Sequence, residues 1–430
     1  MLMGSSKFEI LRETRPLHNP LYLWARVESF DVPEQSSDKN TATIVSLDAL
    51  ACEDPEDLGF VSPAKAESLR HITLHFSRPD SRGGPAEVGS GYQEGDWLRL
   101  TLSAYAHGPL GFVEGPFPSL MSDNESAGGD HPVFFGRVAW IRRAEPDEII
   151  RLSRLCRVDV IIQDGKTPLS NIADADGLNA QHQELLVRVV DVGQASCNAI
   201  HSQPNVNSVL GFYDVGRPLW FQSKSWPTKP PAIHTPKDAF VVLSHWDYDH
   251  YSMALGYKPA LLDLKWYAPF PLHPGPIVKR VITRLGSNLS FITAATQRIF
   301  RGVLLYACTG PANNRNQCGY AMQVQTSQGN ILLTGDADYQ YIPLPAQHGL
   351  KGLVISHHGG TNTGTPPTPL GSLGNAVVSF GIPNKYNHPE STQINRHASV
   401  GWVVIASNWT KHPNLAPIGV RNTRRKDHWL

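Results

Sequence analysis

The chain has 430 residues, of which 38 are Lys or Arg and 38 are Asp or Glu, so its formal net charge is zero. This balance excludes a global field that would attract nucleic acid or an anionic membrane, and any polyanion site must be local. Hydrophobic residues make up 41% and charged residues 18%, as in an ordinary soluble globular protein. The length exceeds that of one hydrophobic core and predicts two domains.

The five cysteines are widely spaced and include no Cys-x-x-Cys pair. This pattern argues against a disulfide framework or a thiolate zinc site and favours a reducing compartment. No apolar run approaches the roughly 18 residues that a membrane span requires, and residues 1–7 have no apolar segment of signal-peptide length. We therefore expect a cytoplasmic protein that makes no membrane contact. The 36 Gly and 34 Pro favour a loop-rich β or α/β protein over a helical bundle.

Residues 1–165 are predicted to form a small β-rich domain. Several segments alternate apolar and polar residues, as half-buried strands do, and turn-rich stretches separate them. These segments include 22–27, 71–76, 97–102 and 133–141. Their spacing favours a barrel or sandwich, and a five-stranded OB-like barrel is one candidate. Residues 146–155 are predicted to form a short helix and residues 166–183 a linker.

Four aromatic residues of this domain allow two interpretations. Together with nearby arginines they could form a platform on which the bases of a nucleic acid stack. The favoured alternative is that they fill a small β core. The four residues are Trp97, Tyr105, Phe112 and Trp140.

From residue 184 to 430 the pattern changes, and strand-like runs alternate with helix-length segments. The predicted strands are 185–190, 209–215, 239–243, 303–307, 320–325, 331–334, 353–355, 376–380 and 402–405. Helices are expected near 277–298, 337–348 and 389–399. Sheets with helices on their outer faces are the implied architecture of this second domain.

Residues that can bind metal ions follow the predicted strands. The densest group, SHWDYDH at 244–250, comes directly after the apolar run 239–243. Alternate residues of an extended segment point the same way, so His245, Asp247 and Asp249 can converge. His250 follows directly after them. Other strand ends carry Asp191, Asp214, Asp336, the pair His357 and His358, and His388. This repetition predicts one functional edge rather than scattered polarity.

The order of these motifs resembles the metallo-β-lactamase superfamily and, within it, the soluble hydrolase domain of ComEC-type competence proteins. The matching strings are DVGQAS at 191–196, SHWDYDH at 244–250, LLTGD at 332–336, SHHG at 356–359 and YNHP at 386–389. The resemblance implies an αββα sandwich with a dinuclear metal site. It covers about 185–410 and does not extend to the first 165 residues.

The sequence departs from the superfamily pattern at several positions. The commoner second motif is H-x-H-x-D-H, and Asp247 stands here in place of its second His. Ala195 replaces a glycine of the first motif. The third-motif His has one poor counterpart, His273, and the Asn-rich loop 313–316 lies where ComEC-type domains also carry Asn.

The resemblance assigns a metal-binding role to seven residues. They are His245 and Asp247 for one ion, Asp249 and His250 for a second, Asp336 as a bridge, and His357 or His358 to complete the second site. Of the last pair, His357 is favoured because it directly follows Ser356. Carboxylate-rich sites suit Mn²⁺ or Mg²⁺ better than the all-His site typical of Zn²⁺, although Zn²⁺ also fits.

Four further roles follow from the same resemblance. Asp249 and His388 are the candidate catalytic residues. His388 would protonate a leaving group or hold a substrate phosphate, and a structural place before Pro389 is the alternative. Asp191 is expected to orient a ligand His from outside the metal shell. Asp214 would do the same or cap the turn before Gly216.

These observations predict a metal-dependent hydrolase that uses a water activated by two divalent ions, Mn²⁺ or Zn²⁺. The favoured activity is that of a phosphodiesterase or nuclease on a nucleic acid or nucleotide. The charge balance favours a short or single-stranded substrate over a long duplex. Two alternatives stay open: hydrolysis of a small ester, lactone or phosphorylcholine-type substrate, and a non-catalytic partner-binding module with a vestigial metal site.

Overall fold

The computed structural model describes residues 15–31, 43–53, 68–76, 92–117, 120, 133–158, 184–202, 204–227, 229–271, 273–300, 302–381, 384, 386, 388–406 and 428–430. The predicted linker 166–183 lies outside these ranges. No helix within them is long and apolar enough to cross a membrane. All five cysteines fall within them, and none forms a disulfide.

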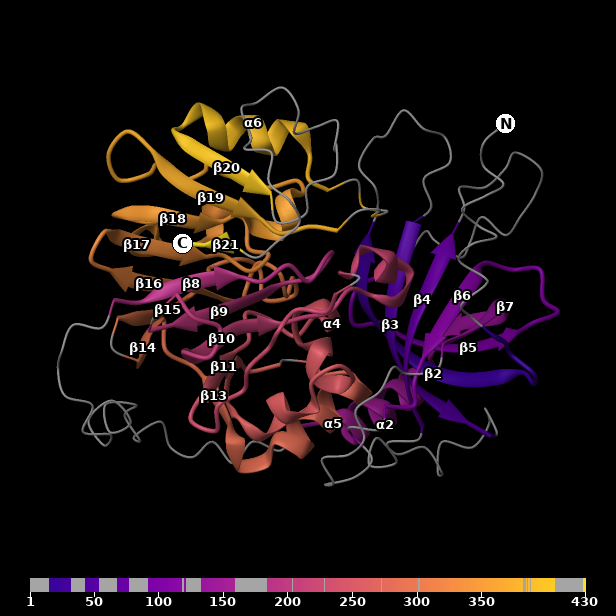
Figure 1. Cartoon of the computed structure of the whole chain (residues 1–430). Coiled ribbons are helices and arrows are strands. Elements are labelled where there is room, and N and C mark those ends of the chain that lie inside the picture. Colours follow the sequence, from indigo (N-terminus) through magenta and orange to yellow (C-terminus); the bar gives the residue numbers. More distant parts are fainter. Residues whose placement is uncertain are drawn as a thin grey trace. The chain divides into compact units, whose positions relative to one another are not determined.

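The chain divides into two compact units, and many of their helices and strands are labelled in Figure 1. The first comprises Met1–Asp159, Leu255–Pro259 and Pro271–Gly286. The second comprises Val160–Ala254, Ala260–Phe270 and Ser287–Leu430.

A closed β-barrel forms most of the first unit. Its strands, in pairing order, are β7 (Val133–Arg143), β5 (Trp97–Ser103), β2 (Leu21–Asp31), β3 (Thr43–Cys52), β4 (Leu69–Phe76) and β6 (Leu110–Glu114). The first half of β7 pairs with β6 and its second half with β5, which closes the barrel. The short strand β1 (Arg15–Pro16) lies parallel to β7. The barrel therefore has six strands, one more than an OB-fold.

The four aromatic residues considered for base stacking are partly in the barrel core and partly on its surface. Trp97 and Phe112 are buried, whereas Tyr105 and Trp140 are exposed. The guanidinium of Arg99 lies 5.3 Å from the centroid of the Trp140 ring. Half of the suggested stacking platform is therefore part of the interior.

Two helices complete the first unit. Helix α2 (Pro146–Cys156) confirms the predicted helix and begins with a capping box formed by Glu145 and Glu148. Helix α5 (Pro276–Leu285) comes from a much later part of the chain, yet Asp48 of the barrel caps its N-terminus. The backbone N–H groups of Ile277 and Val278 donate to this carboxylate at 2.9 and 3.4 Å. The sequence pattern predicts these residues in the second domain, whereas the structure groups α5 with the barrel.

The second unit contains two mixed seven-stranded sheets. The first has the order β13 (Leu289–Ile292), β12 (Lys265–Pro269), β11 (Phe240–Val242), β10 (Val209–Val215), β9 (Cys197–His201), β8 (Leu186–Val189) and β21 (His428–Trp429). The second has the order β14 (Thr296–Phe300), β15 (Val303–Ala307), β16 (Tyr320–Thr326), β17 (Gly329–Leu333), β18 (Leu350–Val354), β19 (Gly374–Val378) and β20 (Trp402–Ala406). Each of the predicted strands overlaps one of these.

The two sheets pack face to face around a shared apolar core (Figure 1). Tyr213 and Val242 of the first sheet and Met322 and Leu333 of the second belong to this core and are buried. Helix α6 (Ser391–Ser399) and the 3₁₀ helices η9 (Tyr339–Tyr341) and η10 (Leu344–Gln347) contribute to a second core, on the other face of the second sheet.

The helical layers are thinner than the sequence predicts. The expected helix near 337–348 consists of the two short 3₁₀ helices, because Pro343 and Pro345 lack the N–H that a continuous helix needs. The expected helix near 277–298 ends at Leu285, and strands β13 and β14 follow.

The direction of the strands brings the motifs together. β10 and β11 are parallel neighbours in one sheet, and β17, β18 and β19 are parallel neighbours in the other. Parallel strands present their carboxyl ends at the same sheet edge, where ligand sites of α/β proteins are usually built. The motif loops follow these carboxyl ends.

Candidate metal centre

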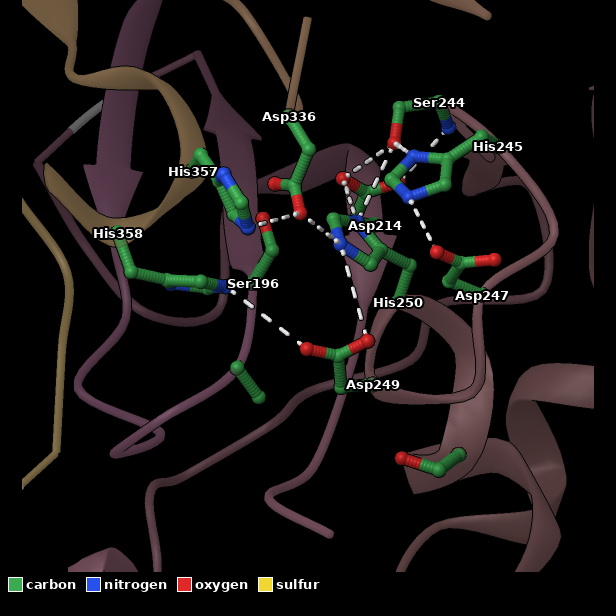
Figure 2. Close-up of polar contacts among 12 residues, drawn as sticks. Ser196, Asp214, Ser244, His245, Asp247, Asp249, His250, Asp336, His357 and His358 are labelled. Carbon is green, nitrogen blue, oxygen red and sulfur yellow. Dashed lines mark hydrogen bonds and ion pairs between the residues drawn. The ribbon is translucent and has the colours of Figure 1, made fainter. Parts of the chain in front are cut away.

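Side chains from separate loops converge beyond these strand ends (Figure 2). The loop after β11 supplies His245 and Asp247, and the short helix α4 (Tyr248–Tyr251) supplies Asp249 and His250. Asp336 follows β17. The 3₁₀ helix η11 (Ser356–Gly359), after β18, supplies His357 and His358.

The ligand atoms form two overlapping groups. His245, His250 and Asp336 each place one ligand atom within 4.8 Å of the others, and so do Asp249, His250 and His358. The Nε2 atom of His250 lies 3.4 Å from an Asp336 oxygen and 3.9 Å from an Asp249 oxygen. The Nε2 atom of His358 lies 3.8 Å from the other Asp249 oxygen.

The hydrogen bonds of His250 and His358 fix which ring nitrogen faces the carboxylates as an acceptor. The Nδ1 atom of His250 lies 2.8 Å from Oδ2 of Asp214. That of His358 lies 2.9 Å from the carbonyl oxygen of Ser379. Carboxylate and carbonyl oxygens can only accept, so both Nδ1 atoms carry a proton. In the neutral rings, Nε2 then has a lone pair directed at the acidic cluster.

The same reasoning applies to His245 through a shared hydroxyl. Ser244 Oγ donates its single proton to Asp214 at 2.9 Å. It must therefore accept the proton from Nδ1 of His245, also at 2.9 Å. The Nε2 lone pair of His245 then faces inward as well. Outer hydrogen bonds of this kind orient the histidine ligands of metal sites.

The three inward Nε2 atoms fit a divalent metal ion. They are buried, and among the described residues none of them has a hydrogen-bond partner. Buried polar atoms of this kind cost free energy unless a partner binds them. A cavity of about 10 Å³, room for roughly one water molecule or ion, is lined by Asp336, His357, His358 and neighbouring residues. Imidazole and carboxylate donors together suit a first-row divalent cation.

The charges at this centre are coupled to one another. Burial lowers the pKa of His250, but the carboxylates of Asp336 and Asp214 outweigh it and hold that pKa well above its ordinary value. Burial raises the pKa of Asp336, but the His250 imidazole outweighs it and leaves the pKa well below its ordinary value. In the metal-free protein His250 therefore takes a second proton, which a metal ion at Nε2 would displace.

Asp214 lies where the sequence suggested an orienting role. Its carboxylate is fully buried and accepts from the backbone N–H of Ser244 at 2.8 Å, besides the two bonds already described. Its φ angle of 58° is left-handed, a conformation that Asp and Asn adopt more readily than other non-glycine residues. Asp191, by contrast, accepts from the backbone N–H of Gly193, two residues away, at 3.2 Å.

The adjacent histidines of η11 point to different places. Their φ angles of 51° and 54° are both left-handed, so the backbone turns sharply there. His358 is buried within the group that contains Asp249. His357, which its sequence position favoured, has a side chain that is 32% exposed and an Nε2 atom 4.0 Å from Asp336. The geometry favours His358 as the ligand.

Asp247 pairs with Arg315, a contact that the sequence pattern does not predict. Its oxygens lie 3.4 Å from Nε2 of His245 and 3.4 Å from Nη1 of Arg315. Burial raises the pKa of Asp247, but His245 and Arg315 lower it further than burial raises it. Among the described residues, Asp247 is in neither metal group. Arg315 lies in the Asn-rich loop 313–316, and the position of this loop among the motifs was the only feature of the sequence that pointed to a residue near the centre.

Two more predicted residues have clear positions. His388 is buried at the side of the centre, its ring centroid 5.2 Å from that of His357. Burial, with His357 and His358 nearby, holds the pKa of His388 well below its ordinary value. His273, the poor counterpart of the third motif, belongs to the first unit.

Known proteins resemble this chain remotely. No protein-family model and no curated protein sequence matches it. Among solved structures, Tm1679, described as a metal-dependent hydrolase of the β-lactamase superfamily, is 14% identical, covers 52% of this chain and 95% of that one, and has a TM-score of 0.32. A long form of RNase Z from yeast is 9% identical, with 74% of this chain and 50% of that one covered and a TM-score of 0.30. A mutant of the β-hydroxylase CmlA is 11% identical, with coverages of 56% and 46% and a TM-score of 0.23. The assignment of the site rests on the geometry described above.

Proposed function

We propose that the second unit is a metal-dependent hydrolase of the metallo-β-lactamase superfamily and that it cleaves phosphodiesters. One observation carries this proposal. Three buried imidazole Nε2 atoms, each on a ring whose Nδ1 proton is bound elsewhere, converge with the carboxylates of Asp249 and Asp336. Three of the five motif strings supply these five side chains: SHWDYDH at 244–250, LLTGD at 332–336 and SHHG at 356–359.

The donor set suggests how two ions would be held. His250 belongs to both groups, but its Nδ1 is bound to Asp214, so its single remaining nitrogen can bind one ion. Asp249, His250 and His358 would hold one of the two ions. His245 would hold the other, and Asp247, which lies 3.4 Å from Nε2 of His245 but in neither group, would join it there. Asp336 would bridge them. Divalent ions supply a nucleophile by lowering the pKa of bound water and stabilise charge on substrate oxygens.

The choice of a phosphodiester follows from the charge of the site. Three carboxylates make the centre oxygen-rich, which suits Mn²⁺. The histidines also suit Zn²⁺, which is the alternative metal. Arg315 and the neutral ring of His388 add donors for an anionic substrate beside the centre. A nucleic acid or nucleotide is the proposed substrate class.

A metal-by-substrate screen tests this function. The chelated protein is reloaded with Mn²⁺, Mg²⁺ or Zn²⁺ and assayed on bis-p-nitrophenyl phosphate, single-stranded DNA and RNA. A carboxyl ester, a lactone and p-nitrophenylphosphorylcholine complete the panel. We expect phosphodiester cleavage that chelation abolishes and Mn²⁺ restores. Asp249→Asn should lose the activity, whereas Asp238→Asn, at an exposed position, serves as the matched control.

The possible outcomes separate the alternatives. Cleavage of carboxyl esters or lactones alone would leave a hydrolase but reject the phosphodiester. Retained phosphodiesterase activity in Asp249→Asn would reject the assigned centre. A protein that binds none of these metals and cleaves nothing would support a non-catalytic module.

A further inference from the structure

His388 is held beside the metal centre by its backbone. Its N–H donates to Oδ1 of Asn384 at 3.0 Å, and its carbonyl accepts from Nδ2 of the same residue at 2.7 Å. The residue is 9% exposed, and its ring lies against that of His357. The position of the ring is therefore well defined, and its chemistry depends on which nitrogen carries the proton.

Gln194 decides that question. Its side-chain oxygen accepts from the backbone N–H of Gly381 at 3.1 Å, and its side-chain nitrogen lies 3.4 Å from Nδ1 of His388. Because a backbone N–H can only donate, the amide oxygen must face Gly381. The amide N–H₂ group must then face His388. The usual ambiguity of a glutamine side chain is removed here by the neighbouring backbone.

An amide N–H₂ group can only donate, so Nδ1 of His388 must accept. The proton of the neutral ring then lies on Nε2. This tautomer is the opposite of that in His245, His250 and His358, whose protons lie on Nδ1. A doubly protonated ring is disfavoured as well, because Nδ1–H would face the N–H of Gln194.

The backbone of a glycine packs closely against the Nε2 side of the His388 ring. A Cβ atom at Gly360 would lie 2.4 Å from Nε2 and 2.6 Å from Cε1. The φ angle of Gly360 is −69°, so its backbone does not itself require glycine. Glycine therefore lets the backbone lie close to the ring, and any side chain at position 360 would displace His388.

We propose that Gln194 is a positioning residue that holds His388 in its Nε2–H tautomer, so that this neutral ring donates a hydrogen bond to a phosphate oxygen of the substrate. The substrate class rests on the proposed function. Donation without transfer is the consistent chemistry, because loss of the proton from a neutral ring would leave an imidazolate. A neutral imidazole can stabilise developing charge on a substrate oxygen in this way. Of the two catalytic roles suggested by the sequence, the hydrogen bonds favour holding a phosphate over protonating a leaving group.

The tautomer can be measured without any activity. Long-range ¹H–¹⁵N NMR of protein labelled in its histidine rings, with His388 assigned from the His388→Gln variant, reports which nitrogen is protonated. We expect a protonated Nε2 in the wild type. Gln194→Glu is nearly isosteric and retains an acceptor for Gly381 N–H, but it presents an oxygen to Nδ1, so the proton should move to Nδ1. Gln340→Glu, an exposed change of the same charge, should leave His388 unchanged.

The role in binding is tested with inorganic phosphate on the metal-loaded protein by calorimetry. His388→Ala should weaken phosphate binding roughly 10- to 100-fold, the usual effect of losing a hydrogen bond to a charged group. Gln194→Met, which removes the donor without adding charge, should weaken it less. It should have no further effect in the His388→Ala background, because Gln194 acts through that ring. Metal affinity should be equal in all these variants.

Two results would overturn the inference. One is an Nδ1–H tautomer of His388 in the wild type. The other is an effect of Gln194→Met on phosphate binding that persists without His388. If the wild type cleaves no phosphodiester but both measurements agree with expectation, the proposed function fails while the role of Gln194 stands.

Discussion

Replacing Asp214 by Asn tests the centre through a residue that touches no metal ion. Asn has nearly the same shape and tolerates the φ angle of 58° at this position. The change therefore replaces one acceptor oxygen by a donor group while the backbone can remain in place. The three protein donors to the carboxylate are Ser244 N–H, Ser244 Oγ–H and His250 Nδ1–H.

The structure predicts how the Asn side chain settles. Ser244 N–H lies 2.8 Å from Oδ1 and cannot become an acceptor, so the amide oxygen must remain there. The amide N–H₂ group then occupies the place of Oδ2, 2.8 Å from Nδ1 of His250. Nδ1 must accept, and the proton of the neutral ring moves to Nε2, the atom that faces Asp336 and Asp249. His250 can then no longer bind an ion without reversing this arrangement.

Loss of an orienting partner typically weakens metal binding 10- to 100-fold, or about 1.4–2.7 kcal/mol. We expect this loss for Mn²⁺ and Zn²⁺ in calorimetric titrations of chelated Asp214→Asn protein, with far-UV circular dichroism unchanged. Asp191→Asn is the matched control, because Asp191 accepts from Gly193 within its own loop. Equal affinity of wild type and Asp214→Asn would refute the assigned tautomer of His250.

Three further predictions concern charge. Arg315→Met should raise the affinity for a second Mn²⁺ ion about tenfold in titrations, because Arg315 no longer competes for the Asp247 carboxylate. A lower affinity for this second ion would contradict the pairing. Because the pKa of His250 is raised, an ion that binds Nε2 would displace a proton, and metal affinity should increase about tenfold per pH unit below that pKa. Calorimetry in buffers of different ionisation enthalpy would detect the released proton. Metal binding that does not change with pH would exclude His250 as a ligand. Burial lowers the pKa of His397 to about 4, so its contribution to stability is present above the unfolded value of about 6.5 and is lost as the pH falls from there towards 4. Urea unfolding should show this loss, at most about 3 kcal/mol, and His397→Gln should reduce it; equal acid sensitivity of the two proteins would disprove the assignment.

The sequence predicts that the motif residues gather at one sheet edge because the signal of each motif is local. Each motif directly follows an apolar run, and parallel strands then bring the separate motifs together without further information. The structure brings the side chains of His245, His250 and Asp336 together, as the motifs suggest. The sequence could not show which of His357 and His358 faces the centre. Both residues have left-handed backbone angles, and their order in the chain does not reveal where either ring points.

The remaining parts depend on contacts between distant residues. Gln194 and His388 are 194 residues apart, and the pairing of Arg315 with Asp247 joins different loops. Strand β9 gave no strand signal because Asn198 and His201 are polar residues at fully or almost fully buried positions. The place of α5 in the first unit depends on contacts with distant residues, such as Asp48 at its N-terminus and the carbonyl of Leu120 beside Arg280, which no periodicity reveals.

The cap that Asp48 provides to α5 has a consequence for the order in which the protein is made. The barrel and α2 are complete at residue 156, but α5 begins at residue 276. At about 5–20 residues per second, a ribosome needs roughly 6–24 s to synthesise the chain between them. During this interval the SHWDYDH segment is synthesised before the first unit has its last helix. The two units therefore cannot mature one after the other along the nascent chain, and the first unit acquires its last helix only after the SHWDYDH segment has been made.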